Sequence, residues 1–122
     1  MPINCSTYQR GGRIAYSNTG SAIAAGDLVI IASGTSGMVG IAVTDIAATT
    51  GTGELNIGAG SEDRVIKTTN KPSGEAWTQG QVLYTDGTNI TSTSSTTFTR
   101  VGRAAFAAAS ADTTAYFILN QP

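Results

Sequence analysis

The sequence predicts a small all-β protein: a single-domain barrel or sandwich with an internal pseudo-repeat and at most one short helical turn. Thr and Ser make up about a quarter of its 122 residues, and the β-branched side chain of Thr favours a pleated, half-exposed surface. Fifteen glycines supply turns and bulges. Lys, Glu and Leu, which are common in long amphipathic helices, are scarce.

The composition is that of one folded domain. Only 12% of the residues are charged, 40% are hydrophobic and the net charge is -1, whereas disordered chains combine low hydrophobicity with high net charge. A chain of this length can bury a core without disulfide bonds. We expect a single β-rich domain over residues 13–122. Residues 1–12 show no hydrophobic periodicity and end in Gly11-Gly12, so we expect an N-terminal arm that is ordered only when docked.

The first half of the chain predicts four strands. The run 28–32 is continuously apolar and of strand length, so it is expected to be buried on both faces. A glycine-bounded turn leads from it into the next strand. Residues 46–53 are expected to form a loop of small residues, and the strand after them alternates polar and apolar residues, which indicates half burial. The four predicted strands are 13–17, 28–32, 38–45 and 54–57.

The second half predicts a similar series, with strands at 64–69, 81–85, from 100 onward and at 116–119. Asp86-Gly87-Thr88-Asn89 has the composition of a hairpin turn. The Ser/Thr tract 91–97 is the best candidate for a mobile tip. The strand that starts at Arg100 runs into alanines, and the segment up to residue 109 could finish as a helical turn.

The two halves resemble each other. Each contains a glycine turn, an apolar strand, a variable loop, a Val-Gly-x-Ala strand and an alanine segment. Two such units, packed by pseudo-symmetry, would give a small barrel or sandwich. Gly40 and Gly102 lie within the second strand of each unit and predict a bulge or a close backbone approach. The matched segments are 25–30, 39–43 and 46–48 in the first half, and 79–84, 101–105 and 107–109 in the second.

The residues for most catalytic chemistry are missing. The chain has no histidine and one cysteine, which removes Ser-His-Asp and Cys-His systems, histidine zinc sites and thiolate metal clusters. No Gly-Lys pair completes a phosphate loop, and the glycine-rich stretches 34–40 and 51–53 open no predicted helix. Glu62-Asp63 could act as a carboxylate pair, but a solvated turn is the favoured interpretation. We therefore expect no enzyme, no cofactor and no metal.

Nucleic acid and membrane are not expected as partners. Binding of nucleic acid needs a basic footprint, and no apolar run approaches the length that spans a bilayer. Met1–Cys5 lacks the basic start of a signal peptide. We expect synthesis in a reducing host cytoplasm, with Cys5 as an uninvolved thiol.

A few side chains are candidates for contacts. Trp77 could stack on a sugar, although a lone Trp in a small domain more often lies in the core or a subunit interface. Arg100 and Arg103 lie on opposite faces if their strand is regular, and each is expected to form a surface or interface ion pair. The candidates for a capsid or subunit interface are Tyr8, Arg10, Arg13, Trp77, Arg100 and Arg103.

Three motifs, in this order and spacing, resemble a known family. They are Gly26-Asp27, the segment 39–45 (Val-Gly-Ile-Ala-Val-Thr-Asp) and the segment 82–87 (Val-Leu-Tyr-Thr-Asp-Gly). The chain is similar over residues 23–120 to small capsid cement, or head-decoration, proteins of tailed bacteriophages. That family was formerly described as a domain of unknown function and some members carry a recombinase label, which the missing phosphate loop contradicts here.

The resemblance implies a β-rich homotrimer that binds the major capsid protein at three-fold positions on the outside of an expanded phage head. The implied location is the exterior of the virion capsid. The alternative is a head-fibre or tail adhesin that binds host glycans, which needs an exposed aromatic platform. Tyr8, Trp77 and Tyr84 are the candidates for such a platform. A small enzyme and a β-rich coat or secreted module from outside phages are further alternatives.

Overall fold

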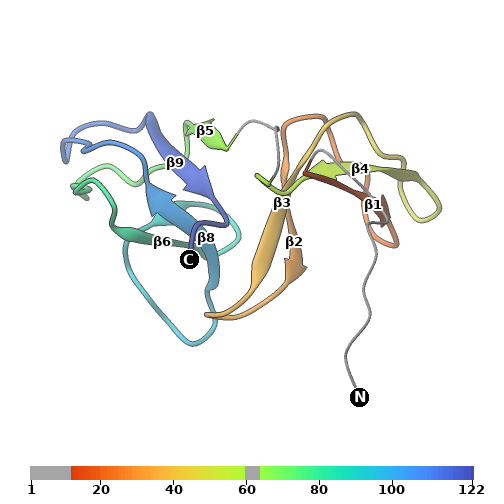
Figure 1. The fold of residues 1–122 in the computed structure, drawn as a ribbon, viewed down its shortest axis with the longest axis horizontal. Helices are drawn as coiled ribbons and strands as arrows, with labels where there is room; N and C mark the ends of the chain where they lie inside the picture. The colour runs from red at the N-terminus through yellow and green to blue at the C-terminus, as the bar shows by residue number, and fades with distance from the viewer. Residues whose placement is uncertain (1–11, 60–63) are drawn as a thin grey trace, which may run out of the picture.

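The structure is a computed structural model that describes residues 12–59 and 64–122. These residues form nine strands in two antiparallel sheets, with no helix among them. The sheets lie side by side and neither closes on itself (Figure 1). The all-β prediction is confirmed, and of its two alternatives the sandwich is correct. Residues 1–11 of the predicted arm, which include Tyr8 and Arg10, and the pair Glu62-Asp63 lie outside the described residues.

Sheet 1 holds the first half of the chain and sheet 2 the second. Sheet 1 has the strand order β1-β4-β3-β2, and sheet 2 has the order β5-β9-β8-β6-β7. The strands of sheet 1 are β1 (Arg13–Ser17), β2 (Leu28–Ala32), β3 (Met38–Ala42) and β4 (Thr52–Asn56). Those of sheet 2 are β5 (Val65–Thr68), β6 (Val82–Thr85), β7 (Ile90–Thr91), β8 (Thr99–Ala104) and β9 (Ala115–Leu119).

The internal repeat is confirmed, and it includes all four strands of sheet 1. With β7 as an addition at the edge, sheet 2 has the same order as sheet 1, so β1, β2, β3 and β4 correspond to β5, β6, β8 and β9. The registers agree as well. Val29 opposes Gly40 as Leu83 opposes Gly102. Outside the strands, the isolated bridge Ile23–Ile46 is matched by the bridge Trp77–Ala108.

The same turn precedes β2 and β6, although different side chains close it. Gly26 and Gly80 adopt φ values of 91° and 85°, a left-handed conformation that glycine reaches without strain. The backbone N–H of each of these glycines donates to the carbonyl of the last residue of the neighbouring strand, at a distance of 2.8 Å. The Asp27 carboxylate accepts the amide of Ala24 in the first turn, and the Gln81 carboxamide accepts the amide of Thr78 in the second.

The glycine inside β8 permits a close backbone approach, as the sequence indicated. A Cβ atom on Gly102 would lie 1.9 Å from the carbonyl oxygen of Ile118 in β9. The register of β8 against β6 shifts at this point, because Leu83 opposes Gly102 whereas Tyr84 opposes Arg100. Val101 is therefore the extra residue of a β-bulge, which reverses the side-chain alternation beyond it.

Two hydrophobic clusters form the core. The smaller one lies in sheet 1 and consists of Val29, Ala42, Ile46 and Leu55. The larger one lies mainly in sheet 2 but includes Val39 of β3, so it joins the two halves. The residues of the larger cluster are Val39, Trp77, Leu83, Ile90, Val101, Ala104, Ala115, Phe117 and Leu119.

Four expectations about local structure are wrong. The apolar strand 28–32 is not buried on both faces, because β2 is an edge strand and Ile30 is 41% exposed. The strand predicted to reach residue 45 ends at Ala42. Ile46, assigned to a loop of small residues, is buried in the core of sheet 1. The alanine segment does not turn into a helix, because Ala108 is held by two hydrogen bonds to the backbone of Trp77.

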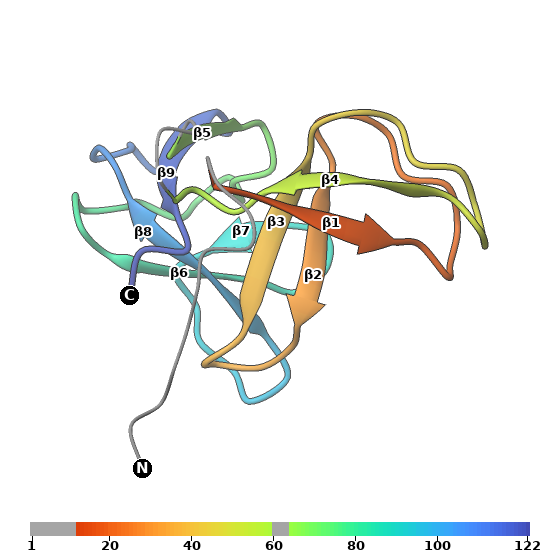
Figure 2. The same ribbon diagram turned by 45° about the vertical axis from the view of Figure 1, so that its right-hand side comes forward.

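Asn120 joins the two sheets beyond the shared core. Only Ile41 and Ala42 of β3 pair with β4, which crosses the end of β3 and turns away (Figure 2). The Asn120 carboxamide takes the vacated place: it accepts the N–H of Val39 (3.1 Å) and donates to the Val39 carbonyl (2.8 Å) and the Ile57 carbonyl (3.0 Å). Asn120 has φ 54°, in the left-handed region that Asn tolerates better than most residues.

We predict that Asn120→Ala lowers the free energy of unfolding by about 2–4 kcal/mol, because three hydrogen bonds are lost and the Val39 amide is left without a partner. Urea denaturation followed by tryptophan fluorescence measures this change. Gln121→Ala is the matched control, since it removes only an exposed contact with Arg64, and its effect should be about 0.5 kcal/mol or less. Equal effects of the two substitutions would contradict the role assigned to Asn120.

Candidate functional site

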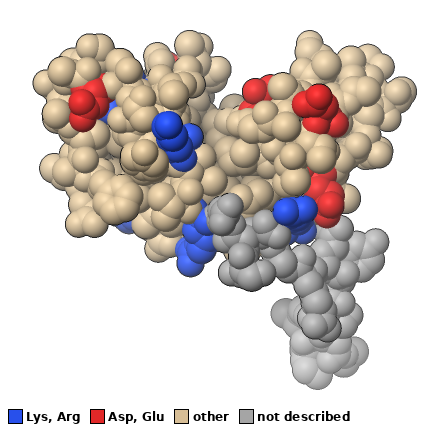
Figure 3. Space-filling view, turned by 90° about the horizontal axis from the view of Figure 1, so that it is seen from above, with Lys and Arg blue, Asp and Glu red and all other residues tan. Residues whose placement is uncertain are grey.

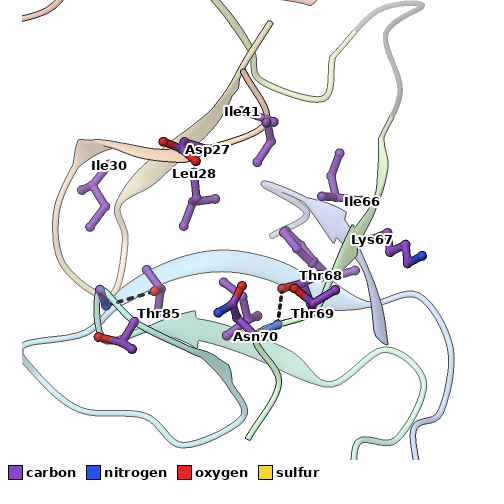
Figure 4. Close-up of a pocket in the computed structure, with 15 residues that line it drawn as sticks. Asp27, Leu28, Ile30, Ile41, Ile66, Lys67, Thr68, Thr69, Asn70 and Thr85 are labelled. Carbon is purple, nitrogen blue, oxygen red and sulfur yellow. Dashed lines mark hydrogen bonds between the residues drawn. The ribbon is translucent and has the colours of Figure 1, made fainter. Parts of the chain in front are cut away.

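A cleft of about 590 Å³ separates β2 from the second half of the chain. Its apolar walls come from Leu28 and Ile41 on sheet 1, and from Ile66 and Phe117 on sheet 2 (Figure 4). Asp27 and Lys67 are the ionisable residues among those that line it. The Asp27 carboxylate is engaged by the turn before β2, and the Lys67 side chain points away from the cleft (Figure 4). The cleft therefore brings together no acid–base pair.

The outer face of sheet 2 is the second feature. It is defined by one row of paired residues across four strands (Val82, Arg103, Ile118 and Val65) together with Lys67, Tyr116 and Phe106. Residues that oppose each other in an antiparallel sheet project from the same face. Phe106 is 54% exposed, Val65 50% and Tyr116 40%. The rings of Phe106 and Tyr116 make an edge-to-face contact with centroids 5.9 Å apart.

The predicted arginines of β8 do not lie on opposite faces. The bulge at Val101 interrupts the alternation, and both Arg100 and Arg103 are half-buried and lie near Pro122. Arg103 donates from Nε to the Pro122 carbonyl and from Nη1 to the Gly80 carbonyl. Arg100 lines a smaller cavity of about 360 Å³ that also includes Pro122. Its Nε is buried without a hydrogen-bond partner among the described residues.

The other sequence candidates lie apart from these arginines. Arg13 is in β1 of sheet 1, where it opposes Asn56. Trp77 is 2% exposed in the core of sheet 2, so it offers no platform for a sugar in the isolated chain. Tyr84 is half-buried in β6. The structure therefore brings Arg100 and Arg103 together, but not Arg13 or Trp77 with them.

Glu75 organises a polar cluster beside Trp77. Its carboxylate accepts the indole N–H of Trp77 (2.8 Å), the hydroxyl of Thr91 (2.6 Å) and the amide of Ser92 (2.6 Å). Burial is the largest single influence and raises the pKa of this carboxyl, but the donated hydrogen bonds together outweigh burial and leave the pKa below its ordinary value. Through Thr91, Glu75 thereby holds β7 in place, the strand of sheet 2 that has no counterpart in sheet 1.

Neither metal coordination nor a membrane span is evident in the parts of the chain that the structure describes. No group of three or more carboxylate, histidine or cysteine side chains there is placed to hold a metal ion. No helix in residues 12–59 and 64–122 is long and apolar enough to cross a membrane.

Comparison with known protein families gives a match to the family described as phage cement protein, over residues 8–119. The chain belongs to the phage cement protein family. No curated protein and no solved structure matches the chain. Membership of the family gives the chain a cement role on a phage capsid and a location in the virion, and it makes the capsid a binding partner. Cement proteins are structural components, which agrees with the non-enzymatic interpretation of the sequence.

Sequence analysis of this cement protein missed the exposed pair Phe106 and Tyr116. Phe106 was hidden within an alanine-rich segment, and Tyr116 was counted only as part of an apolar closing strand. An alignment of the two halves of the sequence could have found them. When Gly40 is aligned with Gly102, Phe106 aligns with Thr44 and Tyr116 aligns with Glu54. Two polar residues of the first half are thus replaced by aromatic residues in the second.

We predict that Glu75→Gln reduces the loss of unfolding free energy that the natural protein shows as the pH becomes acidic. A carboxyl whose pKa is lowered by folding contributes stability that is present above its ordinary value of 4.5 and is lost as the pH falls through the lower, folded value. The stability difference between the natural protein and the variant should therefore shrink as the pH falls below about 4.5. Urea titrations at a series of pH values measure it.

Thr91→Val provides a second, milder test, since it removes the hydroxyl that donates to Glu75. In this variant the pKa of Glu75 should rise, because one hydrogen bond to the charged form is missing. The acid-induced loss of stability should therefore be complete at a higher pH. A profile for Glu75→Gln that runs parallel to that of the natural protein would contradict this role of the carboxylate.

Proposed function

We propose that this chain is a decoration protein that binds the outer surface of an expanded tailed-phage head and stabilises it, as homotrimers at three-fold positions. The observation that carries the proposal is the match to the cement family over residues 8–119. The direct partner would be the major capsid protein, and the other copies of this chain in the trimer would be the second partner. Synthesis in the host cytoplasm and assembly onto the capsid exterior complete the proposal.

The composition suits a protein that works by surface association. Only 12% of the residues are charged, so a large contact can form with little loss of charge hydration. A trimer engages its shell through three subunits at once, and such multivalency amplifies a modest contact affinity. Ligands that bind only one state of an assembly stabilise that state by mass action. A cement protein needs no chemistry beyond this.

Binding should distinguish the expanded shell from the immature one. A three-fold position is formed by several capsid subunits, and their spacing changes when the shell expands. A trimer that must engage these subunits simultaneously loses its multivalent gain when the spacing is wrong. The immature shell is therefore the natural negative control for binding.

We predict that heads without this protein assemble but are fragile. Purified protein added back at saturation should raise the temperature at which the heads release DNA, because bound trimers lower the free energy of the closed shell. Release is measured by dye fluorescence during a heat ramp or after chelator treatment. Equal DNA retention with and without saturating protein would refute the cement proposal and favour the adhesin alternative.

We also propose that residues 1–12 serve as an arm for capsid binding, separate from a single decoration domain over residues 13–122. Deletion of residues 1–11 should weaken binding to heads, because an arm can add contacts such as a strand along a neighbour's edge. The melting temperature should stay unchanged. A deletion that unfolds the domain, or one that leaves head binding intact, would contradict this division of the chain.

A further inference from the structure

We propose that the cavity beside Arg100 binds a carboxylate side chain, from Asp or Glu, on the surface of the capsid protein. The cavity has a volume of about 360 Å³. It is lined by the turn between β2 and β3, by Arg100 of β8 and by the segment after β9. The inference rests on the proposed cement function only for the source of the carboxylate. It adds to that function a site and the class of group that the site takes.

The Arg100 guanidinium contains a buried donor that the chain leaves unused. Its Nε has no hydrogen-bond partner among the described residues. Arg103, in the same strand, uses its own Nε to donate to the Pro122 carbonyl. A buried N–H without an acceptor lowers stability, and more so when the donor carries charge. Because buried donors in folded proteins are nearly always paired, an unpaired guanidinium beside a cavity indicates an acceptor that comes from a partner.

The first half of the chain builds the equivalent strand without an arginine at this position. Met38 stands two residues before Gly40, as Arg100 stands two residues before Gly102. Met is unbranched and flexible, so it covers surface much as the stem of an arginine does, but it brings no donors. Positions where a sequence departs from what folding alone favours are expected to be functional. Arg100 is such a position, since the framework accepts an uncharged side chain in its repeat.

Hydrogen bonds between the two halves hold the walls of the cavity in place. The amide of Arg100 donates to the Gly34 carbonyl, and the amide of Gly34 donates to the Thr99 hydroxyl. On the other wall, the Asn120 carboxamide is fixed by the backbone of Val39. The backbone that carries the guanidinium is therefore anchored to both sheets. A site that is ordered before it binds loses less entropy on binding.

The lining of the cavity favours a carboxylate as the ligand. Among the described residues that line it, none is Asp or Glu and Arg100 is the one cation. A guanidinium binds a carboxylate through two parallel hydrogen bonds, and one cation balances the single charge of one carboxylate. Nucleic acid, in contrast, needs several cations together. Met38 adds an apolar wall for the methylene groups of an acidic side chain, and the volume falls within the range of small ligand sites.

The surface of the protein is poor in charge, so the site must act by direct contact. Only 12% of the residues are charged. Most of the face shown in Figure 3 is uncharged, and its Lys and Arg atoms form no continuous patch. Without a broad basic field, the protein does not gather anions from a distance, and a partner is selected by its fit to the guanidinium. Family membership makes the capsid a binding partner, so we assign the carboxylate to the capsid protein.

Arg100→Met tests the site on heads, because it introduces the residue that the first half has in this place. Affinity for undecorated expanded heads, measured by co-sedimentation, should fall at least about tenfold, since a charged hydrogen-bonded pair is lost. The melting temperature should be unchanged or higher, because an unpaired buried donor is removed. Lys67→Met is the matched control: it removes one positive charge outside this cavity and should leave the affinity within about twofold.

A titration of the free natural protein with sodium acetate tests the ligand class without heads. The side-chain N–H signal of Arg100, assigned by its loss in Arg100→Met, should shift progressively in NMR spectra as acetate is added. The corresponding signal of Arg103 is the internal control, because its Nε already donates to the Pro122 carbonyl. Sodium chloride at equal ionic strength controls for screening. A shift at Arg100 that is no larger than that at Arg103, or no larger than in chloride, overturns the inference.

Zero-length cross-linking on decorated heads identifies the source of the carboxylate. Arg100→Lys keeps the positive charge and places an amine in the cavity, and a carbodiimide joins an amine directly to a carboxylate. Mass spectrometry should find the introduced amine linked to Asp or Glu of the capsid protein. Isotopically labelled chains, mixed with unlabelled ones, reveal links between copies of this chain. A link to another copy in place of the capsid protein, or no link at all, overturns the inference.

The outcomes separate this inference from the cement proposal. If the natural protein stabilises heads and Arg100→Met binds and stabilises them equally well, the inference is overturned and the cement proposal stands. If the natural protein does not bind heads, the cement proposal fails, and the capsid as the source of the carboxylate fails with it. The acetate titration uses the free protein, so it still decides whether the cavity takes a carboxylate.

Discussion

Sheet 1 and sheet 2 are held together through Val39, whose side chain lies in the core of sheet 2 while its backbone belongs to β3. This placement requires β4 to leave β3 early, which would strand the N–H and C=O of Val39 in a buried position. A buried backbone group without a partner is costly. The carboxamide of Asn120 removes that cost, because one side chain supplies both an acceptor and a donor. Packing between the halves therefore depends on a hydrogen-bonding group from the end of β9.

Different polar side chains hold equivalent loops in the two halves. The amide of Asn18 donates to the Gly51 carbonyl in the first half, and the amide of Lys71 donates to the Thr113 carbonyl in the second. Both side chains are buried and hold the adjoining loop: Asn18 donates to the Ala47 carbonyl and Lys71 to the Asp112 carbonyl. The two halves share one backbone arrangement, whereas their surfaces have become different. This separation lets one fold carry two kinds of surface.

Local patterns were sufficient to predict the repeat, the turns and every strand except β7 (Ile90–Thr91), because each depends on neighbours in the sequence. Glycine turns and alternation located β1, β4 and β6 within a residue or two. Burial was harder to predict, since Ile30 and Lys71 take their environments from strand order and from distant loops. Gly102 predicted a bulge or a close backbone approach, but the sequence did not show that a bulge would bring Arg100 and Arg103 to the same face. The exposed face needed the register between halves, which a search for catalytic motifs does not reveal.

The position of Asn120 after β9 has a consequence for synthesis. All four strands of sheet 1 lie within residues 13–56, so a nascent chain can complete this sheet while the second half is still on the ribosome. Domains generally fold in this order during translation. Val39, however, has neither its apolar surroundings nor its hydrogen-bond partner until residue 120 has emerged. The first sheet can therefore form early, but its contact with the second sheet is completed only when Asn120 has emerged.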